Sequence, residues 1–173
     1  MTVISIIKRL IILSSIFSSG VNAGIYMALA PAQIKIATPT TDSNPLLVDV
    51  RLGYTYQSHQ LELVSMNSLQ ANNINQLIID VPTVQAIFYR YSSIPQARIV
   101  SYLIIGASRL DITAQYPNVI KTTETYHGVS VGIGFEEAFQ SIPQLKMKLD
   151  WIRLYSGDQL NIDAVNLGLR YAF

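Results

Sequence analysis

The sequence predicts an all-β protein, an eight-stranded antiparallel up-and-down transmembrane β-barrel that is preceded by a cleaved signal peptide. Apolar residues alternate with small or polar residues over segments of about ten residues, and turn-rich stretches separate these segments. Half of the residues are hydrophobic and only 13% are charged, against roughly 25% in an ordinary soluble domain. No uninterrupted apolar run reaches the roughly 18 residues of a membrane-spanning helix. The high apolar content therefore belongs to strands rather than to helices.

Residues 1–23 have the features of a secretory signal peptide. Lys8 and Arg9 form a basic n-region, residues 10–17 form a short apolar core, and residues 21–23 form a small-residue cleavage site. A membrane-anchoring helix is the alternative, but the apolar core is short for that role. We expect Sec-type export followed by cleavage.

Cleavage would leave residues 24–173 as a single barrel domain. It would remove two of the 12 basic residues and none of the 11 acidic ones, so 10 would face 11. This balance does not resemble the basic surface of a nucleic-acid-binding protein. The chain has no cysteine, which excludes disulfides, thiolate metal sites, cysteine nucleophiles and a lipidated cysteine.

Eight strands are expected, and an even number brings both ends of the mature chain to the same side of the membrane. They are placed at 24–36, 46–56, 59–68, 81–92, 97–111, 123–136, 143–155 and 162–173. The connections at 39–45, 70–76, 117–123 and 156–161 are polar and turn-forming, whereas those between them are shorter or more apolar. Longer loops outside and short turns inside are typical of outer-membrane barrels.

The first three strands alternate, with one irregularity. Pro31 removes a ladder donor from the first strand, which predicts a bulge or an offset pairing there. The second strand places Val48, Val50, Leu52 and Tyr54 opposite Asp49, Arg51 and Gly53. Glu62 falls on the inner face of the third strand.

The fourth and fifth strands have no clean phase over 85–91 and 102–109. One interpretation turns Tyr89 and Tyr91 to the membrane interface and Arg90 to the interior.

The last three strands alternate most clearly. The sixth places Val129, Val131, Ile133 and Phe135 opposite Gly128, Ser130, Gly132, Gly134 and Glu136. The seventh places Leu145, Met147, Leu149 and Trp151 opposite Lys146, Lys148 and Asp150. The eighth places Val165, Leu167, Leu169, Tyr171 and Phe173 opposite Ala164, Asn166, Gly168, Arg170 and Ala172.

Two details favour a transmembrane barrel over a secreted soluble barrel that binds an apolar ligand. The polar face is rich in Gly, Ala and Ser, which fit a crowded barrel interior. Aromatic residues also lie near strand ends, as in membrane-interface girdles. These aromatics are Tyr54, Trp151, Tyr155, Tyr171 and Phe173.

The interior is expected to hold a nearly balanced set of charges, namely Asp49, Arg51, Glu62, Lys146, Lys148, Asp150 and Arg170. Such groups should neutralise one another, because an unpaired ion in a confined space is costly. The set is either a plug of ion pairs or a narrow, weakly selective ion path, and the small interior of an eight-stranded barrel favours the plug.

No arrangement of residues supports catalysis, a cofactor or a metal. Nucleophilic catalysis needs a Ser beside a His, but His127 and Ser130 point to opposite faces of a strand. His59 lies at a turn, and the adjacent Glu136 and Glu137 are interpreted as a turn boundary. The two His are far apart in sequence, and no loop has a calcium-binding pattern.

Four segments carry a family resemblance that runs across the mature chain. GYTYQSHQLELV (53–64), YLIIGASRL (102–110), GVSVGIGFEEAFQSIPQLKMKLDWIRLY (128–155) and VNLGLRYAF (165–173) are similar to the opacity-protein group. These are small eight-stranded outer-membrane barrels, related in architecture to the membrane domain of outer-membrane protein A. The loops here are shorter than those of adhesive opacity proteins.

The resemblance implies a Gram-negative outer-membrane protein in contact with outer-membrane lipid. It implies a surface-exposed structural protein or antigen without catalytic chemistry, and a low-conductance porin for ions or very small solutes is the alternative. It also implies that Leu167, Leu169, Tyr171 and Phe173 form the signal read by the barrel-assembly machinery. The sequence identifies no host-surface molecule as a partner.

Overall fold

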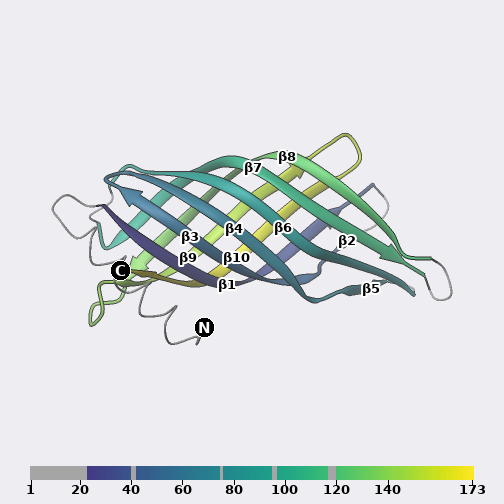
Figure 1. Cartoon of the computed structure of the whole chain (residues 1–173), viewed down its shortest axis with the longest axis horizontal. Coiled ribbons are helices and arrows are strands. Elements are labelled where there is room, and N and C mark those ends of the chain that lie inside the picture. The colour runs from purple at the N-terminus through teal and green to yellow at the C-terminus, as the bar shows by residue number, and fades with distance from the viewer. Residues whose placement is uncertain (1–22, 40–41, 75, 95–96, 117–119) are drawn as a thin grey trace, which may run out of the picture.

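A computed structural model describes residues 23–39, 42–74, 76–94, 97–116 and 120–173 (Figure 1). The predicted signal peptide at 1–23 lies outside the described residues except for Ala23. The strands are β1 (Ala23–Ala37), β2 (Asp42–Ser43), β3 (Leu46–Tyr56), β4 (His59–Gln70), β5 (Asn72–Ile74), β6 (Leu77–Ser92), β7 (Ile99–Gln115), β8 (Thr122–Ala138), β9 (Leu145–Ser156) and β10 (Asn161–Ala172). In the part of the chain that is described, no helix is long and apolar enough to cross a membrane.

Eight long strands in the described residues form a closed antiparallel wall. Each pairs with its neighbour in the order β1, β3, β4, β6, β7, β8, β9, β10. The last strand then pairs with the first, from Tyr26 opposite Ala172 to Ala37 opposite Asn161. The predicted eight-stranded up-and-down barrel is therefore confirmed. The short strands β2 and β5, which the sequence places in loops, pair with β1 and β6 at one rim.

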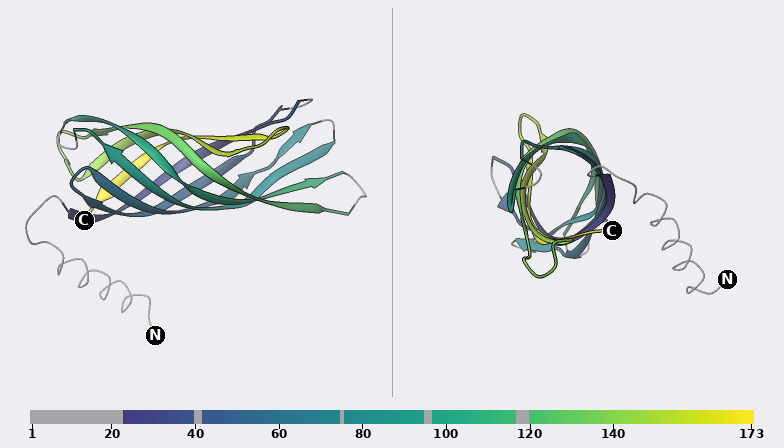
Figure 2. Two further views of the ribbon diagram at one scale, coloured as in Figure 1. Left: turned by 90° about the horizontal axis from the view of Figure 1, so that it is seen from above. Right: turned by 90° about the vertical axis from the view of Figure 1, so that its left-hand side faces the viewer.

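Both ends of the described chain lie at the opposite rim, which we call the terminal end (Figures 1 and 2). There the backbone N–H of Phe173 donates to the carbonyl of Ile25 at 3.0 Å. The other rim, the far end, is reached by β6, β7 and β8, which contain 16, 17 and 17 residues. Because about 9–11 tilted residues cross a bilayer, these strands continue well beyond the lipid.

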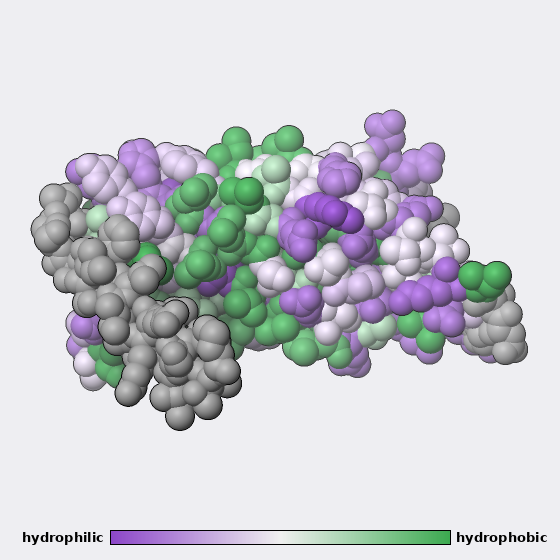
Figure 3. Space-filling view, in the orientation of Figure 1, coloured by the Kyte–Doolittle hydropathy of each residue, from purple (hydrophilic) through white to green (hydrophobic). Residues whose placement is uncertain are grey.

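Side chains alternate between the two faces of the wall, except where the register shifts. Near the terminal end the outer face is apolar, and we call this zone the apolar belt. It includes Met27, Leu29, Val50, Leu52, Leu61, Leu63, Ile87, Tyr89, Leu103, Ile105, Val131, Ile133, Phe135, Met147, Leu149, Leu167 and Leu169, all exposed. Toward the far end hydrophilic side chains cover the outer face, as the change from green to purple in Figure 3 shows.

The polarity of the interior changes in the opposite direction, from charged near the terminal end to apolar toward the far end. Level with the apolar belt it contains a charged layer, made of Asp49, Arg51, Glu62, Arg90, Glu136, Lys146, Lys148, Asp150 and Arg170. Toward the far end it contains an apolar layer, made of Ile34, Ile36, Leu47, Met66, Val84, Leu110, Ile152, Leu154 and Ile162. The belt half is therefore an inside-out barrel, and the far half has the ordinary inside and outside of a soluble barrel.

Proline residues affect the wall at one position and not at another. The expected bulge or offset at Pro31 is wrong, because pairing with β10 skips Ala30 and Pro31 and then resumes in the same register. Pro31 points outward, where its ring has room. The register instead shifts between Asp80 and Thr83 of β6, the interval that contains Pro82.

Candidate functional site: the charged layer

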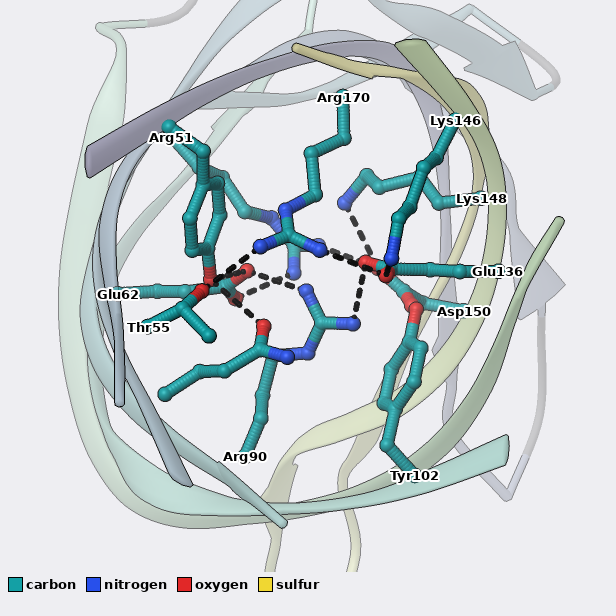
Figure 4. A network of polar contacts seen from close by, with 12 residues as sticks. Arg51, Thr55, Glu62, Arg90, Tyr102, Glu136, Lys146, Lys148, Asp150 and Arg170 are labelled. Atoms are coloured by element: carbon teal, nitrogen blue, oxygen red, sulfur yellow. Dashed lines mark hydrogen bonds and ion pairs between the residues drawn. The ribbon is translucent and has the colours of Figure 1, made fainter. Parts of the chain in front are cut away.

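Period-two alternation aims the charged side chains at the barrel axis. Arg51 and Asp49 come from β3, Glu62 from β4, Arg90 from β6 and Glu136 from β8. Lys146, Lys148 and Asp150 come from β9, and Arg170 comes from β10. Each is flanked along its strand by side chains that face the membrane, so the layer lies at the depth of the lipid. Figure 4 labels these side chains, except Asp49, and shows them converging from all around the wall.

Arg51 is the centre of one half of the layer. Its Nη2 lies 2.7 Å from Asp49 Oδ2 and 2.9 Å from Asp150 Oδ2, and its Nη1 lies 2.9 Å from Glu62 Oε2. Asp49 lies on β3 itself and Glu62 lies on the adjacent strand β4. Asp150 lies on β9, which is separated from β3 by β1 and β10. One guanidinium thereby connects β3, β4 and β9.

Arg90 connects the two halves of the layer. Its Nη1 lies 2.6 Å from Glu62 Oε1, and its Nη2 lies 2.6 Å from Glu136 Oε1. The guanidinium also lies 3.6 Å from the ring centroid of Tyr102, within the range of a cation–π contact. The phenol of Tyr102 donates to the Asp150 carboxylate.

Glu136 accepts from the other side of the layer as well. Arg170 Nη1 donates to its Oε2 at 2.8 Å, and Lys146 Nζ lies 3.8 Å from the same oxygen. Arg170 also donates to Thr55 Oγ1 at 2.8 Å and stacks 3.7 Å from the ring centroid of Tyr26. Since Thr55 is on β3 and Arg170 on β10, this contact bridges β1 inside the barrel at its closure.

Lys148 and Asn166 complete the layer. Lys148 Nζ lies 2.8 Å from Asp150 Oδ2, and Asn166 Nδ2 donates to Asp49 Oδ2 at 2.9 Å. The five cations Arg51, Arg90, Lys146, Lys148 and Arg170 face the four carboxylates Asp49, Glu62, Glu136 and Asp150. Every carboxylate contacts at least two cations, which offsets much of the desolvation of the buried charges.

The seven charges that the sequence predicts inside the barrel all point to the interior. Six are almost completely buried, and Lys146 keeps 22% of its side chain exposed at the terminal end. Sequence reasoning left Arg90 and Glu136 out of the set. Arg90 lies within the 85–91 segment that has no clean phase, but the interpretation that turns Tyr89 and Tyr91 outward and Arg90 inward is confirmed.

The interpretation of Glu136 and Glu137 as a turn boundary is wrong. Strand β8 continues to Ala138, so the two carboxylates point to opposite faces. Glu136 joins the charged layer, whereas Glu137 accepts from Arg98 Nη2 at 2.8 Å on the outside. Gly134 lies on the face whose glycines the sequence predicts to fit a crowded interior, and a Cβ there would lie 2.4 Å from Asp150 Oδ1 and from the Tyr102 ring.

Neither histidine belongs to a catalytic arrangement. His127 is exposed on the outer face, whereas Ser130 is buried and donates to the Leu154 carbonyl at 3.4 Å. His59 contacts the hydroxyl of Tyr89 and the ring of Tyr91 on the outer face near the terminal end. Among the described residues no group of three or more His, Asp or Glu could hold a metal ion.

Three of the five predicted interface aromatics, Tyr54, Trp151 and Tyr155, differ in their surroundings. Tyr54 and Trp151 are exposed on the outer face. Tyr155 packs edge-on against Tyr126, with ring centroids 5.3 Å apart, in the far half. There Tyr126 donates to Glu124, and this hydrogen bond, with a smaller contribution from burial, raises the pKa of Tyr126 to about 12.

A closed eight-stranded barrel with an apolar belt is the architecture of bacterial outer-membrane proteins. The chain is a bacterial outer-membrane β-barrel, as the sequence predicts. No protein-family model and no curated protein matches it.

Solved structures share its fold. Neisserial surface protein A is 11% identical, with a TM-score of 0.66 over 88% of this chain and 99% of that one. Ail, the attachment invasion locus protein of Yersinia pestis, was solved in complex with the heparin analogue sucrose octasulfate; it is 12% identical, with a TM-score of 0.63 over 87% of this chain and 97% of that one. The N-terminal β-barrel domain of Pseudomonas aeruginosa OprF is 13% identical, with a TM-score of 0.61 over 90% of this chain and all of that one. At these identities the likeness concerns the fold.

Proposed function

We propose that the protein is a small surface barrel of opacity type, a structural protein or antigen that presents its far-end loops outside the cell and neither conducts nor catalyses. The coarse part of this role agrees with the folds and names of its structural neighbours, one a surface protein and one an attachment protein. The even number of strands supports the orientation, because both ends of an exported chain would remain in the periplasm.

The observation that carries the proposal is that two successive layers of side chains, one charged and one apolar, close the barrel interior. The charged layer fills the barrel with side chains that hold one another at 2.6–2.9 Å. Beyond it lies the apolar layer, in which Ile34, Leu47, Met66 and Leu110 have no exposed surface. A hydrated ion would have to break the ion pairs and then cross a dry apolar zone, where an unpaired charge is very costly.

The low-conductance porin remains the competing function, and planar-bilayer recording separates the two. Refolded protein should produce no stable unitary current steps. Folding is verified first by different mobilities of unboiled and boiled samples on SDS gels. Stable steps that change in Lys148→Ala or Arg170→Ala would overturn the proposal, because only a path through the charged layer would respond to both.

We also propose that Leu167, Leu169, Tyr171 and Phe173 act as the assembly signal. Leu167, Leu169 and Tyr171 project outward from β10 and Phe173, directly after it, is exposed as well, so a binding partner could reach them on a strand that has not yet closed against β1. Protease treatment of intact cells tests the orientation, because cleavage should occur in the far-end loops and leave both chain ends protected.

A further inference from the structure

One cation in the wall lacks the partner that the others have. Lys35 pairs with Asp42 and Arg153 with Asp163 on the outer face, and every Lys or Arg of the charged layer contacts a carboxylate. Arg109 of β7 has no carboxylate within 4.0 Å among the described residues, although it is exposed and lies within a strand. In the described strands it is the only Lys or Arg of which this is true.

Arg109 lies in a row of polar side chains that crosses four strands. Ser65 of β4 is opposite Gln85 of β6, Gln85 is opposite Arg109, and Arg109 is opposite His127 of β8. All four side chains are on the outer face. A guanidinium, an amide, a hydroxyl and an imidazole therefore stand side by side with hydrogen-bond donors available to a ligand.

The row forms the upper edge of a shallow groove of about 520 Å³. Its lower edge is the apolar row Leu63, Ile87 and Ala107, the last residues of the apolar belt on β4, β6 and β7. The groove is hollow because Ser65 and Ala107 are small, while Leu63, Ile87 and Arg109 beside them are long. It thus straddles the boundary between apolar and polar surface.

The nearest acid on the same face, Asp111, lines a small pocket with Arg109 but forms no ion pair with it within 4.0 Å. Asp111, one row toward the far end, accepts a hydrogen bond from Thr125 Oγ1 at 2.7 Å. Glu124, further out, accepts from Tyr126. The positive charge of Arg109 remains available at the depth where lipid headgroups lie, because the apolar belt ends immediately below it.

We propose that this groove binds a phosphate group of the phosphorylated glycolipid of the outer leaflet, with an acyl chain of the same molecule over Ala107. Arg109 supplies the charge and two parallel N–H donors that suit a phosphate, and Gln85, Ser65 and His127 supply neutral hydrogen bonds. The inference goes beyond the proposed function but rests on its orientation, which turns the far end of the barrel to the outer leaflet.

The test uses refolded mature protein in nanodiscs of phosphatidylcholine that contain a small fraction of bisphosphorylated lipid A. Native mass spectrometry counts the lipid A molecules retained by each barrel. Arg109→Gln should lower retention about fivefold, the effect of roughly 1 kcal/mol for one cation at a membrane surface. The matched control is Arg153→Gln, which removes a paired cation from β9 and should leave retention unchanged.

Two further lipids identify the ligand. Dephosphorylated lipid A should be retained by the wild type as weakly as lipid A is by Arg109→Gln. Phosphatidylglycerol retained as well as lipid A would overturn the assignment to the glycolipid. Unchanged retention in Arg109→Gln, or an equal loss in Arg153→Gln, would overturn the site. Conduction plays no part in this readout, so its outcome is independent of whether the barrel is closed to ions.

Discussion

The guanidinium of Arg51 on β3 lies 2.9 Å from the carboxylate of Asp150 on β9, and the two strands share no backbone hydrogen bonds. β1 and β10 stand between them in the wall. Side-chain ion pairs therefore connect parts of the barrel that the hydrogen-bonded ladders do not join directly. The same is true of Arg90 on β6 and Glu136 on β8, which are joined at 2.6 Å.

Glu62→Gln should strongly destabilise the barrel. Glu62 contacts Arg51 and Arg90 and accepts from the Tyr26 hydroxyl at 2.8 Å. Removing its charge leaves two buried guanidinium groups undercompensated, which costs about 3–5 kcal/mol. Urea unfolding of the protein in lipid vesicles measures the loss. The control Glu137→Gln breaks the exposed pair with Arg98 and should cost no more than about 1 kcal/mol. Equal losses would mean that the interior pairs contribute no more than surface ones.

Gly168→Ala should impair closure between the first and last strands. A Cβ at Gly168 would lie 2.2 Å from the Leu29 carbonyl oxygen and 2.6 Å from the Ala30 Cα, and backbone atoms within a ladder cannot easily move aside. We expect a smaller fraction of protein with the mobility of the unboiled folded form on SDS gels. Gly24→Ala is the control, because its Cβ would meet only Phe173 O at 3.7 Å. Normal folding of Gly168→Ala would show that the β1–β10 seam tolerates more separation than the structure indicates.

Leu149→Arg should cost about 2–4 kcal/mol on insertion into vesicles, the penalty for a cation facing the middle of the lipid. Leu149 projects outward from the centre of the apolar belt. Gln33→Arg introduces the same side chain on the outer face of the far half, where a surface change should stay within about 0.5 kcal/mol. Folding titrations with urea compare the two. A large penalty at Gln33 would place the lipid boundary further toward the far end.

Phe173→Ala should separate assembly from stability. Its ring is exposed and packs edge-on against Tyr171 at 5.3 Å, so truncation should lower the free energy of unfolding by about 1 kcal/mol. The amount of protein that reaches the outer membrane of cells should nevertheless fall strongly. Phe135→Ala removes an outward-facing ring of similar exposure from β8 and should leave that amount unchanged. Equal abundance of the two variants would contradict a signal role for Phe173.

Much of the fold follows from the alternation in the sequence. The period of two identifies the eight strands and the face to which Arg51, Lys148 and Leu149 point. It also gives strand limits close to the observed ones, except that β4, β6 and β7 extend further at the far end.

The ion-pair partners inside the barrel could not be predicted from the alternation. Which carboxylate meets Arg90 depends on the stagger of all eight strands around the axis, and stagger is a property of the closed wall. The apolar layer was missed for a related reason. Ile34 and Leu110 follow the same period of two as the other residues of their strands. Only the assembled barrel shows that the outer face is polar in the far half, where these two side chains point inward.

The far half has a dry apolar centre and a polar exterior, so it does not need lipid to hold its shape. The segments that connect its strands are therefore attached to a rigid support. Changes of sequence in those connections leave the ion-paired half untouched, because the apolar layer separates the two. Such a scaffold lets its far-end segments change in sequence while the part that resides in the membrane stays the same.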